Sequence, residues 1–351
     1  MHGPSPRLLL AVAALAGVGC DRSPSPSSTL RDAAVPIAPS ASAPKSVWQK
    51  MTALESDTGK GEILTDKNVP ELWIPNVVVT GLAIHRGSVW WSDAAGVHER
   101  PFDGEARLAL PGQRAELAAD DDGVVFAAIQ GPSRFELQTL TAGESAPRRL
   151  AAMRCSPLQL VTAKSDVIIA STCAISAVPK RGGPPRVLEP ETHLDVSLTA
   201  EGDQTCYVNG DRVICRSLAD RRAKPLVIDA HRAGPLLLEG QTLYWLEDTG
   251  AADVIVAGDF GRLVRWELPG GPRRVLTSMQ RQAFVLLHDE RALYYGNGAG
   301  SVRRVFKADG RVQTLYNVGE LETPNLAIGG GYVYFSTGSA PGIHRFRLAA
   351  E

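Results

Sequence analysis

The residues best suited to acid–base chemistry lie together in VWWSDAAGVHERPFDG, which runs from Val89 to Gly104. These sixteen residues include a carboxylate (Asp93), a histidine (His98), a second carboxylate (Glu99) and two tryptophans. A histidine beside a carboxylate is a pair that many enzymes use to move protons. The same residues also fit a turn followed by a strand, so the surrounding chain must decide between a reaction site and a structural unit.

Two further stretches resemble ligand-binding loops. GNGAGS, residues 296–301, has the glycines of a phosphate loop, but a strand-like segment follows it where such a loop needs a helix N-terminus. ADDDG, residues 119–123, has the carboxylates of a calcium site but lacks the ligand spacing of an EF-hand. No Gly-x-Ser-x-Gly or His-Glu-x-x-His motif occurs. We therefore expect turns at both positions, and no catalytic residue, metal site or cofactor.

A repeat of about 40 residues runs through the chain and accounts for these stretches. In each copy a leucine is followed seven residues later by a short segment that is apolar in most copies. A loop, an alternating segment and a final apolar piece such as RRLA or RRVL come next. Short strands separated by Gly, Asp and Pro turns are typical of an all-β array, and four strands per repeat are typical of a propeller blade. The seven leading leucines are Leu82, Leu117, Leu160, Leu198, Leu236, Leu286 and Leu326.

We therefore predict an all-β fold, a seven-bladed β-propeller of four-stranded blades, over residues 48–351. The seventh copy contains only three strand-like segments before Glu351, whereas an extra piece, GEILTD at residues 61–66, precedes the first copy and resembles the fourth-strand pieces. We expect this N-terminal strand to complete the last blade and close the ring. Closure of this kind leaves no unpaired strand edge around the ring.

The segments VWWSD, LYYGN and LYW resemble those of YWTD-type and related bacterial seven-bladed propellers over residues 60–351. The resemblance implies the fold but no single function, because this architecture hosts binders, scaffolds and enzymes. Alignment of the copies within the chain places Asp93 in the turn after a second strand, Trp90 and Trp91 between blades, and His98 in a third strand. We interpret the opening stretch as one blade and not as a reaction site.

Four cysteines follow the N-terminal one and form the strongest local signal. Cys206 and Cys215 flank YVNGDRVI, and a two-residue Gly-Asp turn would place them opposite each other in a hairpin. Cys155 precedes the first strand of blade three and Cys173 ends its second strand, so both lie at one end of that blade. We expect the disulfides Cys155–Cys173 and Cys206–Cys215, with the other two pairings as alternatives. A zinc site is the rival, but Cys-x-x-Cys spacing is absent.

Blade five departs from the repeat in EDTGAADVIVAGDFG, residues 247–261, where other copies have only a few residues between the second and third strands. The centre of this loop is apolar, and long loops that depart from a repeat often lie on a binding face. We expect a binding loop at the end of the ring where the crossings between blades lie. The alternative is an extended hairpin that packs on itself. The candidate contact residues are Asp248, Asp253, Ile255, Asp259 and Phe260.

The N-terminal segment predicts export. Its apolar run at residues 8–19 is too short to span a bilayer but fits an export signal, and LAGVGC resembles a bacterial lipoprotein signal. The resemblance implies that residues 1–19 are removed and that Cys20 carries the lipid, the alternative being an ordinary signal peptide cleaved nearby. Residues 20–47 are rich in Pro, Ser and Ala and predict a disordered tether. Whether the inner or the outer membrane holds the anchor stays open.

Composition excludes one class of partner. The net charge is -1 and the basic residues are scattered, so the stripe that nucleic acids require is absent. We predict an exported, lipid-anchored, monomeric propeller that binds an envelope protein or cell-surface component without chemistry. The alternatives are a purely structural envelope protein and an enzyme of the lactonase or lyase type. The enzyme would need several carboxylates or histidines at the starts of the innermost strands, where Glu116 is the one carboxylate.

Overall fold

A computed structural model describes residues 70–348, except for 113–114, 132–133, 142–143, 145, 191–196, 231, 249–260, 281–282, 298–300, 318–324 and 337–340. The predicted signal (1–19), the tether (20–47) and the predicted closing strand (61–66) lie outside the described residues. Within the described part the chain forms 28 strands. No helix there is long and apolar enough to cross a membrane.

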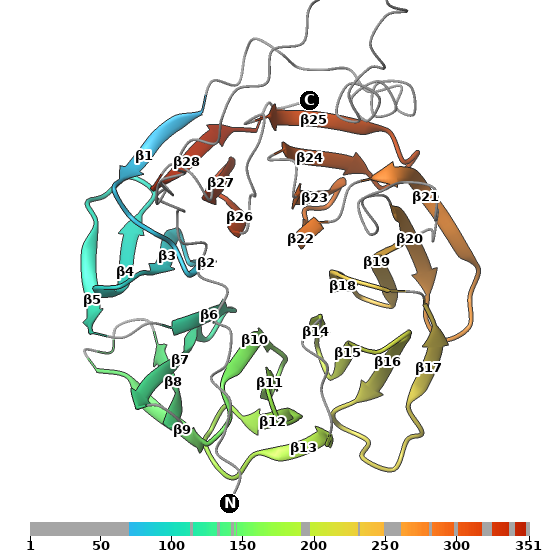
Figure 1. Ribbon diagram of the computed structural model, residues 1–351, viewed down its shortest axis with the longest axis horizontal. Helices are drawn as coiled ribbons and strands as arrows, with labels where there is room; N and C mark the ends of the chain where they lie inside the picture. The colour runs from blue at the N-terminus through green and yellow to red at the C-terminus, as the bar shows by residue number, and fades with distance from the viewer. Residues whose placement is uncertain are drawn as a thin grey trace, which may run out of the picture. The chain divides into compact units, whose positions relative to one another are not determined.

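The strands form seven antiparallel sheets of four strands each, arranged as blades around one axis (Figure 1). In six sheets the strands follow chain order from the innermost to the outermost strand. The fold is therefore the seven-bladed β-propeller that the repeat predicts. Two disulfides, Cys155–Cys173 and Cys206–Cys215, lie within blades three and four.

Blades one to three contain, in order, β2 (Gly81–His85), β3 (Ser88–Ser92), β4 (Gly96–Pro101) and β5 (Arg107–Pro111); β6 (Ala115–Ala119), β7 (Gly123–Gly131), β8 (Arg134–Thr141) and β9 (Arg148–Met153); and β10 (Pro157–Thr162), β11 (Asp166–Ser171), β12 (Ile175–Pro179) and β13 (Arg186–Glu189). Blades four to six contain β14 (Leu198–Glu201), β15 (Gln204–Asn209), β16 (Arg212–Ser217) and β17 (Leu226–Asp229); β18 (Leu236–Glu239), β19 (Thr242–Asp248), β20 (Gly261–Glu267) and β21 (Arg273–Gln280); and β22 (Ala283–His288), β23 (Ala292–Asn297), β24 (Ser301–Phe306) and β25 (Val312–Asn317). Blade seven contains β26 (Asn325–Gly329), β27 (Tyr332–Ser336), β28 (Gly342–Arg347) and β1 (Glu71–Pro75).

Blade seven takes its outermost strand from the N-terminal side of the chain, because β1 pairs with β28 (Figure 1). An N-terminal strand closes the ring, as predicted, but this strand is Glu71–Pro75 and not residues 61–66. The length of the connections between blades explains why the closing strand lies at residues 71–75. In the structure two to eight residues join an outermost strand to the next innermost strand, whereas a strand at 61–66 would leave fourteen. Short connections are the rule in compact domains.

Most outermost strands contain a one-residue bulge at an equivalent place. In β1 the register steps from Leu72 to Ile74 and leaves Trp73 out of the ladder. Similar steps occur in β5, β9, β13, β21 and β25, whereas β17 pairs without one. A bulge brings two consecutive side chains toward the core. Trp73 and Ile74 are accordingly both buried, as are Leu150 and Ala151 in β9.

A second repeated contact lies at the residue that follows the third strand, which we call the latch position. Its backbone N–H donates to a carbonyl in the turn between the first and second strands of its own blade. Its side chain packs on the preceding blade: the ring of Phe102, for example, stacks on that of Tyr334 at 6.0 Å between centroids. The described latch residues are Phe102, Lys180, Leu218, Leu268, Lys307 and Leu348.

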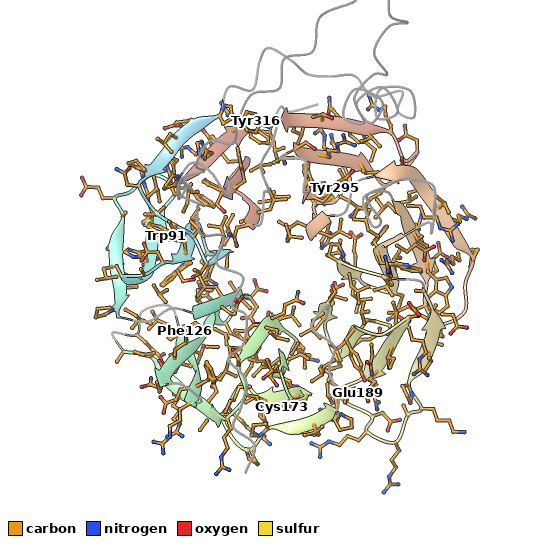
Figure 2. The ribbon with its side chains drawn as sticks, in the orientation of Figure 1. Trp91, Phe126, Cys173, Glu189, Tyr295 and Tyr316 are labelled. Atoms are coloured by element: carbon orange, nitrogen blue, oxygen red, sulfur yellow. A yellow bond between two sulfur atoms is a disulfide. The ribbon has the colours of Figure 1, made fainter. Side chains whose placement is uncertain are left out.

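The apolar core is divided among the seven seams between neighbouring blades. Its largest side chains come from the second strands. Trp91 of β3, Phe126 of β7 and Tyr295 of β23 are almost fully buried, and Figure 2 shows all three among the packed side chains of their blades. Interblade packing by the aromatic residues of the repeat is therefore confirmed, and it fixes the innermost strands around the axis.

Candidate binding site in the central channel

A cavity of about 1840 Å³ lies on the axis of the ring and is lined by the innermost strand of every blade. We call the end where these strands start the crossing end, because the chain arrives there from the preceding blade. The loops between second and third strands lie at the same end. We call the opposite end, where the innermost strands turn into the second strands, the turn end. The side chains that line the cavity at the starts of the innermost strands are Thr80, Glu116, Gln159, Ser197, Pro235, Val285 and Asn325.

Several polar side chains at the crossing end join neighbouring blades. Gln159 of blade three donates to the carbonyl of Leu198 at 3.4 Å and accepts from its N–H at 2.9 Å. Ser197 Oγ of blade four accepts from the N–H of Leu236 at 2.9 Å. Because these bonds satisfy otherwise unpaired backbone groups, the side chains stabilise the ring and are not free to bind a ligand with the same atoms.

Glu116 differs from these neighbours. Its carboxyl lines the cavity at the start of β6, opposite Ala127 of β7, and has no hydrogen-bond or ion-pair partner among the described residues. Burial raises its pKa from 4.5 to about 7. The strands that pack most closely against β6 are β2, β3, β7 and β10. Their one titratable side chain is His85, which lies at the turn end with Nδ1 2.5 Å from the carbonyl of Asp120.

The lining of the cavity is acidic. It includes one arginine, Arg232, and six carboxylates. Two of the six are neutralised by neighbouring cations, because Lys180 Nζ lies 2.6 Å from Asp120 Oδ2 and Arg262 Nε lies 2.5 Å from Glu247 Oε1. Because the carboxylates of the lining outnumber its arginine, the lining has a net negative charge, which favours the entry of cations. The six are Glu116, Asp120, Asp121, Glu201, Asp211 and Glu247.

Glu247 anchors the base of the long blade-five loop. Only 2% of its side chain is exposed, and it accepts hydrogen bonds from Trp245 Nε1 at 2.9 Å, from Arg262 and from Arg273. This cluster has no signature in the sequence. No motif joins the four residues, since Arg273 is 26 positions away and reaches Glu247 only through the fold.

The blade-five loop leaves the sheet beside the cavity. Asp248, the last residue of β19, pairs with Gly261, the first residue of β20. Leu246, Glu247 and Gly261 all line the cavity, so the loop starts and ends at the crossing end. The other predicted contact residues, Asp253, Ile255, Asp259 and Phe260, lie outside the described residues.

Asp93 and His98 form a compact structural unit. Asp93 Oδ1 accepts hydrogen bonds from the N–H groups of Ala95 at 2.7 Å and Gly96 at 3.1 Å, and it lies 3.0 Å from His98 Nε2. The His98 ring stacks on Trp91 with centroids 5.0 Å apart. The carboxylate thus closes the turn between β3 and β4, as Asp commonly does in turns. This agrees with the interpretation of the stretch as one blade.

Charged clusters lie at the turn end, at two latch positions. Lys180 contacts Asp120 and Asp122, and Lys307 Nζ lies 2.6 Å from Glu239 Oε1. The ADDDG stretch is a turn, as expected, because Asp120 Oδ1 accepts from the N–H of Asp122 at 2.8 Å. In GNGAGS, residues 298–300 lie outside the described residues. No group of three or more His, Cys, Asp or Glu side chains in the described part could hold a metal ion.

Both disulfides join the cysteines that the strand positions predict. Cys206 and Cys215 are directly opposite in β15 and β16, with Cα atoms 4.1 Å apart. Cys155 precedes β10 and binds Cys173, which follows β11, with Cα atoms 5.9 Å apart. Disulfides persist in oxidising compartments, so the pair indicates a location outside the reducing cytoplasm.

Comparison with known proteins supports the fold and assigns no family. No family model matches the chain, and no curated protein matches its sequence. Among solved structures, PorZ, a surface component of the type IX secretion system of Porphyromonas gingivalis, is similar with a TM-score of 0.59 and 10% identity. The match covers 80% of this chain but 38% of PorZ, so this chain corresponds to little more than a third of that protein.

Two other similar structures are propellers that match this chain over nearly their whole length. YCF48 bound to a D1 peptide matches with a TM-score of 0.58 and 12% identity, over 82% of this chain and 98% of YCF48. Virginiamycin B lyase from Staphylococcus aureus, solved with quinupristin, matches with a TM-score of 0.58 and 12% identity, over 81% of this chain and 99% of the lyase. At these identities the matches establish a seven-bladed β-propeller and no particular subtype.

Proposed function

We propose that the protein is a non-catalytic binding module of the cell envelope whose binding face is the crossing end of the ring. One partner protein or cell-surface component would contact the blade-five loop and the rim of the cavity around it. The observation that carries this proposal is the buried Glu247 cluster, which holds the two stems of the loop at the rim. Binding loops on a rigid scaffold are the common solution in repeat proteins.

Export and anchoring complete the proposal. The two disulfides support an oxidising location, and the LAGVGC segment supports lipid attachment at Cys20 after removal of residues 1–19. Residues 20–47 would then separate the propeller from the membrane. We also propose that the chain is related to the YWTD-type bacterial propellers, because its VWWSD, LYYGN and LYW segments resemble theirs. The chain would act as a monomer and would not bind nucleic acid.

The test is cross-linked affinity purification from detergent-solubilised envelope with three versions of the chain. One is intact, one has residues 249–259 replaced by a plain turn, and one has residues 220–223 of the blade-four turn-end loop replaced in the same way. We expect one envelope protein to co-purify with the intact chain and with the blade-four variant but not with the blade-five variant. A parallel Cys20→Ala version should lose its partition into the detergent phase.

Other outcomes would reject parts of the proposal. If the partner is recovered equally with the shortened blade-five loop, the crossing-end rim is not the interface. If nothing specific is recovered from any version, a purely structural role or an enzyme of the lactonase or lyase type becomes the better account. Retention of Cys20→Ala in the detergent phase would reject the lipid anchor alone.

A further inference from the structure

We propose that the channel binds a cationic group carried on an apolar body, an alkyl ammonium or a basic side chain among apolar residues, with Glu116 as its counter-ion. This inference goes beyond the envelope partner proposed above, because it concerns the cavity and not the blade-five loop. Nothing in it requires that the loop be an interface.

The shape of the cavity favours a ligand with an apolar body. Between the polar crossing end and the charged turn end, aliphatic side chains of the innermost strands contribute to the walls. An aliphatic stretch between two polar ends can receive the apolar part of a ligand, as apolar walls do in small-ligand pockets. The aliphatic wall residues include Leu82, Leu117, Leu158, Val161, Leu237, Leu287 and Ile328.

The charge of the cavity selects a cation. The carboxylates of the lining outnumber its one arginine, and Glu116 is a carboxylate that the described residues leave without a compensating partner. Lys180 compensates Asp120, and Arg262 and Arg273 compensate Glu247, so the fold neutralises other carboxylates of the same lining. A largely buried carboxyl without a partner is costly in its charged form, and an incoming ammonium or guanidinium removes that cost.

Binding of a cation should release protons. Burial raises the pKa of Glu116 to about 7, so near neutral pH the empty site is partly protonated, and a bound cation would expel that proton. No titratable side chain of β3, β7 or β10 faces Glu116, and His85 of β2 lies at the far end of its strand against the Asp120 carbonyl. Affinity for the cation should therefore rise with pH through this range.

The experiment is calorimetric titration of the full chain with probes that differ only in charge: octylamine, octanol and octanoate. We expect octylamine to bind most tightly, and to release protons at pH 7 when two buffers of different ionisation enthalpy are compared, with the release absent in Glu116→Gln. Glu116→Gln should weaken octylamine about tenfold, because one charge-assisted hydrogen bond is lost. Glu105→Gln, the same substitution at an exposed glutamate outside the cavity lining, is the matched control and should leave the affinity unchanged.

Two further measurements extend the titration. A peptide probe distinguishes a peptide ligand from a small amine, and a charge-reversed variant shows that a change at Glu116 alters specificity without unfolding the protein. An acetylated Leu-Ala-Lys-Ala-Leu amide that binds more tightly than octylamine, and whose norleucine counterpart does not bind, would identify a peptide as the ligand. Tighter binding of octylamine would identify a small amine. Glu116→Lys should prefer octanoate. Binding of octylamine that Glu116→Gln leaves unchanged, equal binding of octanoate, or binding of neither cation would each overturn the proposal.

Discussion

Two glutamates near the crossing end, Glu247 and Glu116, differ in whether the protein compensates their charge. Glu247 is fully buried and accepts bonds from a tryptophan and two arginines, so its charge is compensated within the protein. Glu116 is largely buried and uncompensated among the described residues, and its pKa rises as a result. A compensated carboxylate serves structure, whereas an uncompensated one in a cavity is a candidate for contact with a ligand.

Glu116 should make stability depend on pH in a defined window. Its pKa is higher in the folded protein, about 7, than in the unfolded chain, 4.5, so the folded state holds the proton more tightly. The contribution is fully present below about pH 4.5 and is lost as the pH rises through about 7. We expect Glu116→Gln to equal the wild type at pH 4.5 and to exceed it by about 2 to 3 kcal/mol at pH 8.5. Urea unfolding at the two pH values measures this, and equal stability at pH 8.5 would contradict it.

At the scale of elements, the outermost strands were the hardest to place from sequence. Fourth-strand pieces share only a short apolar pattern, so GEILTD at residues 61–66 and ELWIP at 71–75 both fit it. The structure selects the second because Trp73 occupies the bulge position and packs against Tyr334, 5.1 Å away between ring centroids. That contact joins residues 261 positions apart, which no local pattern can reveal.

Replacement of Trp73 by alanine tests the closing strand. Only 5% of this side chain is exposed, and the guanidinium carbon of Arg100 lies 4.2 Å from its ring centroid. We expect Trp73→Ala to lower the free energy of unfolding by about 3 to 5 kcal/mol, the usual cost of removing a buried large aromatic side chain. Leu72→Ala, in the same strand but with 51% of the leucine exposed, is the control and should cost about 0.5 kcal/mol or less. Equal effects in chemical denaturation would argue against β1 as the closing strand.

The innermost and second strands were more predictable than the closing strand. Their leucine and apolar triplet recur with fixed spacing in most copies, and each strand joins the next through a short turn. The same regularity placed the cysteines of blades three and four and identified Glu116 as the one carboxylate at the strand starts. Lys180 and Glu247 were missed because their partners come from another blade or a distant strand.

At the scale of the molecule, the blades are joined by apolar seams and, at two described latch positions, by ion pairs. Lys180 of blade three reaches Asp120 of blade two, and Lys307 of blade six reaches Glu239 of blade five. Phe102 occupies the equivalent position in blade one and makes an aromatic contact. The latch position therefore joins neighbouring blades by an ion pair in some blades and by an aromatic contact in another.

The Lys180 pair should contribute to stability only above acidic pH. Burial opposes the charged form of Asp120 most strongly, but hydrogen bonds from Lys180 and the backbone, together with the lysine charge, outweigh it and lower its pKa below 3.8. The contribution is present above about pH 4 and is lost as the pH falls further. We expect Lys180→Met to cost about 1 to 2 kcal/mol at pH 7 and much less at pH 2.5, measured by thermal unfolding.

A matched control separates this pair from general charge effects. Lys164→Met removes a lysine of the same blade that is 72% exposed and 3.7 Å from Asp203, so it should change little at either pH. If Lys180→Met is less stable than the wild type by the same amount at pH 7 and at pH 2.5, the Lys180–Asp120 pair is not the cause of the loss of stability at acidic pH. Asp289, whose pKa is also lowered in the fold, would then remain as a source of acid sensitivity.

The closing strand also determines how the ring would carry a mechanical load. The chain enters β1 from its N-terminal side, so tension on that segment is applied along an outermost strand. Four cross-strand pairs between β1 and β28 would have to slide together, and the guanidinium groups of Arg100 and Arg345 both contact the ring of Trp73. A force along the strand shears these bonds in parallel, whereas a sideways force breaks them in turn, because ladder bonds run perpendicular to the strands. The closing strand should therefore resist a pull along its own axis more strongly than a pull across it.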